Sequence, residues 1–155
     1  MTGLPLDPLE LLRQESGLSI DLEGRFRHRG DPITHARTLE VLWSSLRRSD
    51  DGRYEVRIGR ERGYVRIEDA PYGVRGATVE PGGPLLHLTD GSSEPLDPST
   101  LRLGRDGVLR CAVKGGHRAR FCRAAQASLG QLLEEPEPGR YRIVLGGRPW
   151  PIPVE

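Results

Sequence analysis

An internal repeat constrains the fold of this chain more than any other feature of its sequence. Residues 24–30, a run with helical periodicity and residues 52–59 are echoed by residues 107–115, another such run and residues 139–146. In both copies a Gly-Arg-Tyr triplet leads into a strand pattern. A unit that recurs at a long offset indicates one supersecondary structure used twice. We therefore predict an α+β fold built from a duplicated unit of β-hairpin, helix and β-hairpin.

The repeat divides the 155 residues into three segments. We predict an N-terminal helical arm over residues 1–22, because Asp7-Pro8 before a leucine-rich run is typical of a capped helix start. The first repeat covers residues 23–93 and the second covers residues 94–155. The boundary between them is placed in the polar stretch at 90–98, which carries both Gly and Pro.

Apolar spacing predicts the elements within each repeat. Leucines and a tryptophan at i, i+3, i+4 and i+7 predict a helix over residues 36–48, and a longer apolar stripe predicts a second helix over 121–133. Alternation over 54–67 predicts a hairpin, in which a four-residue turn would place Val56 opposite Val65.

The last hairpin is expected to turn at Gly146-Gly147, with Ile143 opposite Trp150. Three prolines in the final strand, at positions 149, 151 and 153, cannot donate ladder hydrogen bonds. We therefore expect this strand to lie at the edge of a sheet.

Charge and cysteine content limit the partners of the chain. Its 23 basic and 22 acidic residues leave no overall cationic field, so we expect no nucleic-acid partner. No run approaches the roughly 20 apolar residues that cross a bilayer, and no secretion signal is evident, so we expect no membrane partner and a cytoplasmic location. Cys111 and Cys122 have no second pair to complete a metal site, and we predict no cofactor and no metal.

Adjacent carboxylates at the exit of a strand form the first candidate site. Glu68 and Asp69 could hold a cation or accept hydrogen bonds from a base or ribose, with Tyr72 stacking on the ligand. Turn chemistry explains the same residues, with Asp69 capping a turn and Tyr72 in the core, and it is the favoured alternative. No residue is predicted to be catalytic, since no nucleophile or acid–base motif is present.

Arginines at equivalent places in the two repeats form the second candidate site. Arg53 and Arg140 both begin a strand, and such a pair could clamp an anionic ligand between the repeats. Arg66 completes the set of candidate ligand-binding residues. Exposed ion pairing is the simpler explanation for these arginines.

The sequence resembles a bacterial family known as domain of unknown function 1285. The resemblance is carried by Gly30-Asp31-Pro32-Ile33, Asp51-Gly52-Arg53-Tyr54 and the run from Val65 to Tyr72, and it is clearest over residues 23–76. It implies a duplicated α+β fold, a carboxyl half similar to pleckstrin-homology domains, a ligand site between the halves and a signalling role with a nucleotide-like ligand.

Three functions remain open at this point. The first is a non-enzymatic binding or signalling module that holds a small anionic, nucleotide-like ligand between the repeats and reports it to a protein partner. The second is a protein-interaction adaptor without a small ligand, which would use the edge of the last strand. The third is a metal-dependent enzyme using Glu68 and Asp69, which requires both carboxylates to point into one cleft.

Overall fold

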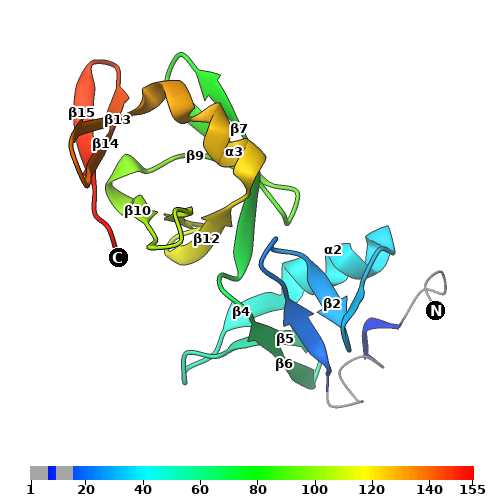
Figure 1. Cartoon of the computed structure of the whole chain (residues 1–155). Helices are drawn as coiled ribbons and strands as arrows, with labels where there is room; N and C mark the ends of the chain where they lie inside the picture. Colours follow the sequence, from blue (N-terminus) through cyan, green and yellow to red (C-terminus); the bar gives the residue numbers. More distant parts are fainter. Residues whose placement is uncertain (1–6, 10–15) are drawn as a thin grey trace. The chain divides into compact units, whose positions relative to one another are not determined.

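The chain folds into two compact units, Met1–Pro71 and Tyr72–Glu155. The structure is a computed structural model that describes residues 7–9 and 16–155 (Figure 1). Strands make up most of the regular secondary structure of both units, with helix α2 (Ala36–Ser45) in the first unit and helix α3 (Arg123–Ser128) in the second. No helix in these described ranges has the length and apolar character needed to cross a bilayer.

The first unit is a six-stranded sheet with the strand order β3-β2-β1-β6-β5-β4. Its elements are β1 (Leu18–Ile20), β2 (Phe26–His28), β3 (Asp31–Pro32), α2 (Ala36–Ser45), β4 (Leu46–Arg48), β5 (Tyr54–Ile58) and β6 (Glu61–Ile67). The central strand β1 runs antiparallel to β2 and parallel to β6. It therefore joins the two hairpins of this unit into one sheet.

Strand β1 lies within the segment that the sequence analysis assigned to a helical arm. Its three residues are all buried, because both neighbouring strands and the core surround them. Further upstream, Pro8 and Leu9 are helical and the amide of Leu9 donates to Asp7 Oδ1 at 3.2 Å. The rest of the predicted arm helix falls outside the described residues.

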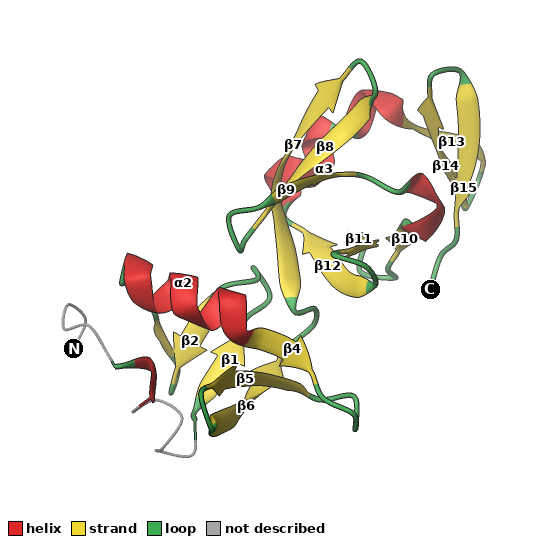
Figure 2. Cartoon of the chain, turned by 180° about the vertical axis from the view of Figure 1, so that it is seen from behind, coloured by secondary structure: helices red, strands yellow, loops and turns green. Residues whose placement is uncertain are grey.

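Helix α2 covers one face of this sheet (Figure 2). It begins after His35, whose Nδ1 accepts a hydrogen bond from the amide of Thr38 at 3.4 Å. Leu42 is fully buried, and Trp43 packs edge-on against Phe26 with ring centroids 4.5 Å apart. The predicted apolar stripe is confirmed, although the helix ends at Ser45 where the chain enters β4.

The hairpin of β5 and β6 has a different register from the predicted one. Val56 pairs with Gly63, not Val65, because the turn contains two residues instead of four. Gly59 has a φ of 62°, a conformation that tight hairpin turns require and that glycine adopts without strain. The prediction of a four-residue turn was wrong, and the shift places Glu55 opposite Tyr64.

The second unit contains a six-stranded sheet, β10-β11-β12-β7-β8-β9, and a three-stranded sheet, β13-β14-β15. Its strands are β7 (Tyr72–Glu80), β8 (Gly83–Leu88), β9 (Ser93–Pro95), β10 (Arg102–Leu103), β11 (Leu109–Val113), β12 (His117–Phe121), β13 (Leu133–Glu137), β14 (Arg140–Leu145) and β15 (Arg148–Ile152). Its helices are α3 (Arg123–Ser128) and the 3-10 turns η1 (Pro98–Thr100) and η2 (Gly130–Leu132).

The predicted boundary between the repeats, after residue 93, does not separate the two units. Strands β7 and β8 precede it and β9 spans it, but all three belong to the second unit. Strand β7 pairs in parallel with β12, with Tyr72 opposite Ala119. This long-range pairing has no signal in local sequence, since a polar stretch is equally compatible with a domain boundary and with a sheet turn.

Helix α3 is shorter than the predicted helix over 121–133. Cys122 caps its start by accepting the amide of Ala125 on Sγ at 3.4 Å. The helix ends at Ser128, η2 follows, and Leu133–Glu137 forms β13 instead of a last helical turn. Pairing of β13 with β14 overrides the helical spacing of the leucines.

The closing hairpin has the predicted register. Ile143 lies opposite Trp150 and Tyr141 opposite Ile152, and β15 is an edge strand of its sheet. Both units contain hairpin, helix and hairpin in the same order, but the hairpins share one sheet in the first unit and lie in separate sheets in the second.

Candidate functional site

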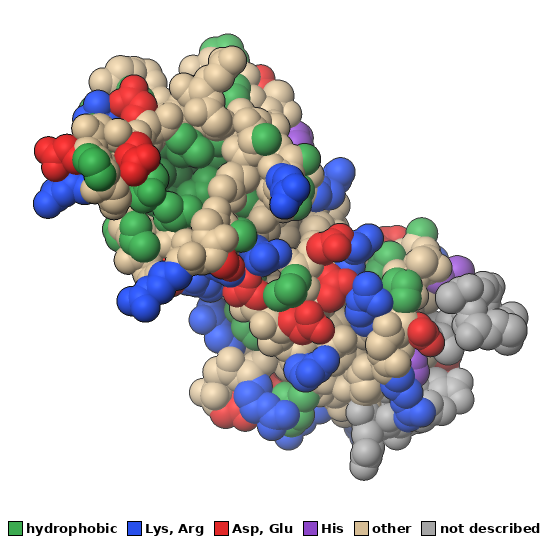
Figure 3. All heavy atoms as spheres, in the orientation of Figure 1, with side chains coloured by type: hydrophobic (Ala, Val, Ile, Leu, Met, Phe, Trp, Pro, Cys, Tyr) green, Lys and Arg blue, Asp and Glu red, His purple; other side chains and the backbone are tan. Residues whose placement is uncertain are grey.

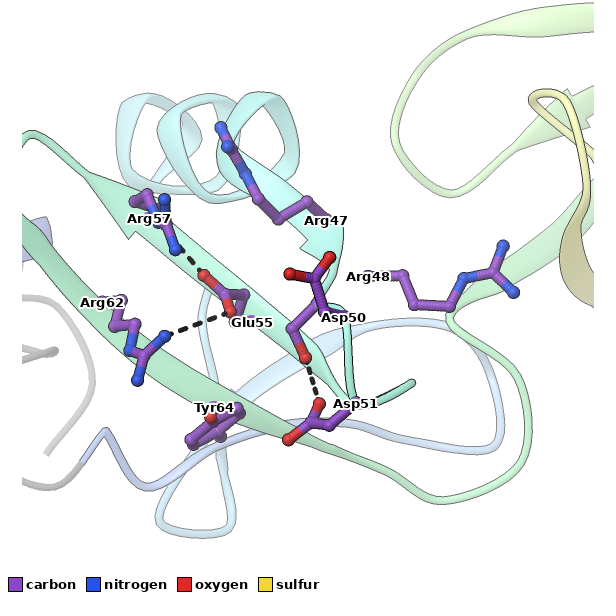
Figure 4. A pocket seen from close by; sticks show the side chains of 9 residues that line it. Arg47, Arg48, Asp50, Asp51, Glu55, Arg57, Arg62 and Tyr64 are labelled. Atoms are coloured by element: carbon purple, nitrogen blue, oxygen red, sulfur yellow. Dashed lines mark hydrogen bonds and ion pairs between the residues drawn. The ribbon is translucent and has the colours of Figure 1, made fainter.

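A hollow of about 440 Å³ lies on the first unit. We call it the arginine hollow, and its lining residues are Arg47, Arg48, Ser49, Asp50, Asp51, Glu55, Arg57, Arg62 and Tyr64. They come from β4, β5, β6 and the β4–β5 turn (Figure 4). Because side chains alternate along a strand, Glu55 and Arg57 lie on the opposite face of the sheet from the core residue Val56.

Glu55 is the most unusual residue of the arginine hollow. Its side chain is only 1% exposed, and Oε2 accepts a hydrogen bond from Arg57 Nε at 3.2 Å. Its other oxygen, Oε1, is 4.0 Å from a guanidinium nitrogen of Arg62 and has no hydrogen-bond partner among the residues that the structure describes. A buried carboxylate is costly unless it is paired and fully hydrogen-bonded. The hollow therefore holds an unsatisfied buried acceptor.

The β4–β5 turn forms one wall of the hollow and is held by its own hydrogen bonds. Asp51 Oδ1 accepts the amide of Arg53 at 3.0 Å and the hydroxyl of Ser49, and the amide of Ser49 donates to the carbonyl of Arg53 at 2.7 Å. These hydrogen bonds hold the pKa of Asp51 below its ordinary value, the Ser49 bond contributing most. The carboxylate of Asp51 thus accepts hydrogen bonds within the turn and stabilises it.

Arg53, the first of the predicted anion-binding arginines, lies beside this hollow. Its guanidinium stacks on the ring of Tyr64, with 3.6 Å between the guanidinium carbon and the ring centroid. Arg62 approaches the same ring at 5.6 Å. The ring of Tyr64, which lies opposite Glu55, thus contacts two arginines. Neither Tyr64 nor Arg62 was among the predicted site residues.

The other arginines of the hollow are exposed. Arg47 and Arg48 lie on β4, and the guanidinium of Arg48 is 5.8 Å from the ring centroid of Tyr54. The side chain of Arg47 forms no ion pair with any residue that the structure describes. Its charge is available to an anion.

The predicted pair of carboxylates, Glu68 and Asp69, does not line the arginine hollow. Glu68 is an exposed residue whose carboxylate lies 3.6 Å from the guanidinium of Arg66, and its amide donates to the carbonyl of Ile20. Asp69 is half-buried and has its own interaction partner. Within the described ranges, no group of three or more His, Cys, Asp or Glu side chains is arranged to hold a metal ion.

Tyr72 and Arg140, the remaining predicted residues, belong to the second unit. Tyr72 is buried, its ring centroid is 5.8 Å from that of His117, and Lys114 Nζ is 5.8 Å from the tyrosine ring. Arg140 is exposed and lies 3.5 Å from Glu137. These contacts match the structural alternatives that the sequence left open, namely core packing for Tyr72 and surface ion pairing for Arg140.

Local sequence did contain a signal for Glu55. The alternation of β5 places Glu55 and Arg57 on one polar face. The predicted four-residue turn, with Val56 opposite Val65, would also place Glu55 opposite Arg66, where the carboxylate would be paired on an outer face of the sheet. In the observed register Glu55 lies opposite Tyr64 of β6 and opposite Arg47 of β4, so that an arginine of β4 lies on the same face.

Comparisons with known proteins identify the fold. No protein-family model matches the sequence, and no curated protein matches it. A DUF1285 family protein from Silicibacter pomeroyi DSS-3 has a similar structure, with a TM-score of 0.67, 20% sequence identity, and coverage of 87% of this chain and 78% of that one.

A DUF1285 family protein from Shewanella baltica OS155 is also similar, with a TM-score of 0.60 and 19% identity, over 74% of this chain and 90% of that chain. At these identities the comparison concerns the fold. The resemblance found in the sequence is thus confirmed at the level of structure: this chain has the fold of the DUF1285 family proteins.

Proposed function

We propose that this protein is a binding module that takes a small anionic, nucleotide-like ligand in the arginine hollow of its first unit. The observation that carries the proposal is Glu55, a carboxylate 1% exposed whose Oε1 lacks a hydrogen bond in a hollow otherwise rich in arginine. Such an acceptor is satisfied when a ligand supplies an O–H or N–H donor.

Charge in the hollow favours an anion. The lining contains four arginines and three carboxylates. The carboxylate of Asp51 is used by its turn, and that of Glu55 by Arg57 and, at 4.0 Å, by Arg62. Arg47 and Arg48 form no ion pair with any residue that the structure describes, so they are the cations least compensated by neighbours. Hydrogen bonds between guanidinium and phosphate are short and strong because both groups are charged.

A nucleotide-like ligand combines the two features that the hollow requires. Its phosphate would contact the arginines, and a ribose hydroxyl or a base N–H would donate to Glu55 Oε1. The volume of about 440 Å³ lies within the range of small-molecule sites. Tyr64 holds Arg53 and Arg62 in place, so that part of the site is formed before the ligand arrives.

The test is isothermal titration of the full chain with AMP, ribose 5-phosphate and inorganic phosphate. We expect AMP and ribose 5-phosphate to bind more tightly than phosphate, because only they bring a donor for Glu55. Arg62→Gln should weaken binding about tenfold or more, as expected for one hydrogen bond between charged groups. Glu55→Gln should remove most of the difference between AMP and phosphate.

Arg66→Gln is the matched control. Arg66 lies four residues from Arg62 on the same strand, is exposed as well, and does not line the hollow. The proposal fails if none of the three compounds binds, or if Arg66→Gln and Arg62→Gln cause the same loss.

The proposal includes a signalling role, a duplicated origin of the two hairpin–helix–hairpin units and a pleckstrin-homology-like second unit. The common order of elements supports the duplication.

An adaptor without a small ligand is the alternative function, and it would be favoured if none of the three compounds binds in the titration. Prolines at 149, 151 and 153 remove amide donors from the chain at and just after edge strand β15, which protects this edge against strand addition. An adaptor would therefore use another surface.

A further inference from the structure

A second hollow, of about 420 Å³, lies within the second unit. We call it the apolar hollow, and its lining residues are Leu103, Gly107, Leu109, Gln126, Leu133, Glu134, Glu135, Tyr141, Arg142 and Ile152. Figure 3 shows hydrophobic side chains gathered in a hollow on this unit. Nothing in the proposed function uses it.

Main-chain pairing supports the walls of the apolar hollow. Tyr141 and Ile152 are opposite one another on β14 and β15. Beyond β15, the amide of Leu103 donates to the carbonyl of Pro153 and the amide of Glu155 donates to the carbonyl of Leu103, both at 2.9 Å. The three-stranded sheet is thus tied to β10, and the walls that carry Leu103 and Ile152 are held together by backbone hydrogen bonds.

The amide and the ion pair in the lining of this hollow are satisfied by protein groups. Gln126 Oε1 accepts the amide of Leu109 at 2.9 Å, and its Nε2 donates to the carbonyl of Gly107 at 2.9 Å. Arg142 pairs with Glu134 through contacts of 2.7 and 2.8 Å. These groups already have hydrogen-bond or ion-pair partners within the protein, so a polar ligand would satisfy no further group here, in contrast to Glu55 Oε1 of the arginine hollow.

Glu135 supplies the one lining charge without an opposite charge beside it. Its Oε2 accepts the amide of Gly139 at 2.9 Å. Arg142, the only cation in the lining among the residues that the structure describes, is already paired with Glu134. The lining therefore has a net negative charge, which disfavours a carboxylate or phosphate on the ligand.

We propose that the apolar hollow binds a neutral alkyl chain, such as that of a medium-length alcohol. Apolar side chains from β10, β11, β13, β14 and β15 supply the contact surface, and its volume suits a small molecule. Burial of apolar surface drives the binding, and the paired polar groups of the lining stay as they are. The occupant is thus chemically opposite to that of the arginine hollow.

The test uses displacement of the neutral fluorescent probe N-phenyl-1-naphthylamine from the full chain. We expect one saturable probe site per chain, and displacement by hexanol, heptanol and octanol with affinity rising about fourfold per methylene, the ratio that corresponds to about 0.8 kcal/mol for each buried CH₂. Octanoate should displace the probe less well than octanol, because of the charge of Glu135.

Two filling variants and one control locate the site. Leu103→Phe and Leu133→Phe should each reduce probe and octanol affinity at least tenfold, whereas Val79→Phe, at an exposed site of the same unit, should not. Far-ultraviolet circular dichroism verifies that each variant folds. Probe binding that does not saturate, that survives both filling variants, or that is displaced better by octanoate than by octanol overturns the proposal.

Discussion

The arginine hollow and the apolar hollow are almost equal in volume, about 440 and 420 Å³, but opposite in chemistry. In the first unit the hollow lies on the sheet face whose residues alternate with the core, so charged side chains line it. In the second unit the strands contribute leucines, a tyrosine and an isoleucine to the lining of the apolar hollow. Volume alone therefore says little about the ligand.

The state of the polar groups separates the two hollows more sharply than composition does. Glu55 Oε1 is buried without a hydrogen bond, whereas the amide of Gln126 uses both its oxygen and its nitrogen within the protein. An unsatisfied buried acceptor favours a ligand that donates, and satisfied groups favour a ligand that contributes only apolar surface.

The largest effect is expected from a change beneath the arginine hollow. Leu42 of α2 is fully buried against the opposite face of the first sheet. Leu42→Ala should lower the free energy of unfolding of the first unit by about 2–5 kcal/mol, through lost burial and the cavity left behind. Urea unfolding followed by Trp43 fluorescence in a Trp150→Phe background measures it. A loss no larger than that of Val79→Ala would contradict the packing of α2.

A smaller effect is expected at the loop that carries Gly107 into the apolar hollow. A β-carbon at Gly104 would lie 2.3 Å from a guanidinium nitrogen of Arg110 and 2.4 Å from Asp106 Oδ1. Gly104→Ala should break the Arg110–Asp106 pair, at a cost of about 1–2 kcal/mol since Asp106 is half exposed.

Cys111, next to Arg110, reports this change. Burial raises the pKa of the Cys111 thiol to about 12, so in the native protein it should react with iodoacetamide only after the unit opens. The alkylation rate of Cys111, measured by peptide mass spectrometry with Cys122 as internal reference, should rise in Gly104→Ala. Equal rates in the variant and the native chain would mean that the loop tolerates the methyl group.

Ionic strength should distinguish the two hollows directly. Raising NaCl from 0.05 to 0.5 M should weaken AMP binding in the arginine hollow several-fold, because salt screens contacts between exposed charges. Octanol binding in the apolar hollow should stay constant or strengthen slightly, since no charge of the ligand is involved. If both affinities fall together, the assignment of polar and apolar ligands to the two hollows is wrong.

The sequence predicted local elements better than it predicted this pair of hollows. The stripe of Leu39, Leu42 and Trp43 and the Gly146-Gly147 turn each depend on neighbouring residues, and both are confirmed. The parallel pairing of Tyr72 with Ala119 joins residues 47 positions apart, and nothing in either segment specifies the other.

The candidate site was harder to predict for the same reason. Arg53 was singled out because it and Arg140 occupy equivalent places in the two repeats, each at the entry to a strand. It does lie beside the arginine hollow, where its guanidinium stacks on Tyr64. Glu55 was missed because its burial depends on a two-residue turn instead of a four-residue one, a difference that moves its partner from Arg66 to Tyr64. A change of two residues in register decides which charges are buried.

The smallest effect concerns acid pH, and it should act on the first unit before the second. His28 is half-buried on β2, and its Nε2 forms no hydrogen bond with any residue in the described ranges 7–9 and 16–155. Burial, with a contribution from Arg29, lowers the pKa of His28 from its ordinary value of 6.5. The unfolded chain therefore binds a proton at a higher pH than the folded unit does, and stability should fall as the pH drops below about 6.5.

The carboxylates that are stabilised in their charged form act in a different pH range. Asp21 in the first unit and Asp90 and Asp106 in the second have pKa values lowered below 3.8, so their contributions are lost only in stronger acid. As the pH falls from about 6.5 toward about 4, the free energy of unfolding of the first unit, followed by Trp43 fluorescence, should decline in the native chain and stay more constant in His28→Gln. The alkylation rate of Cys111 in the second unit should not change over this range. An identical decline in His28→Gln would assign the acid sensitivity of the first unit to another group.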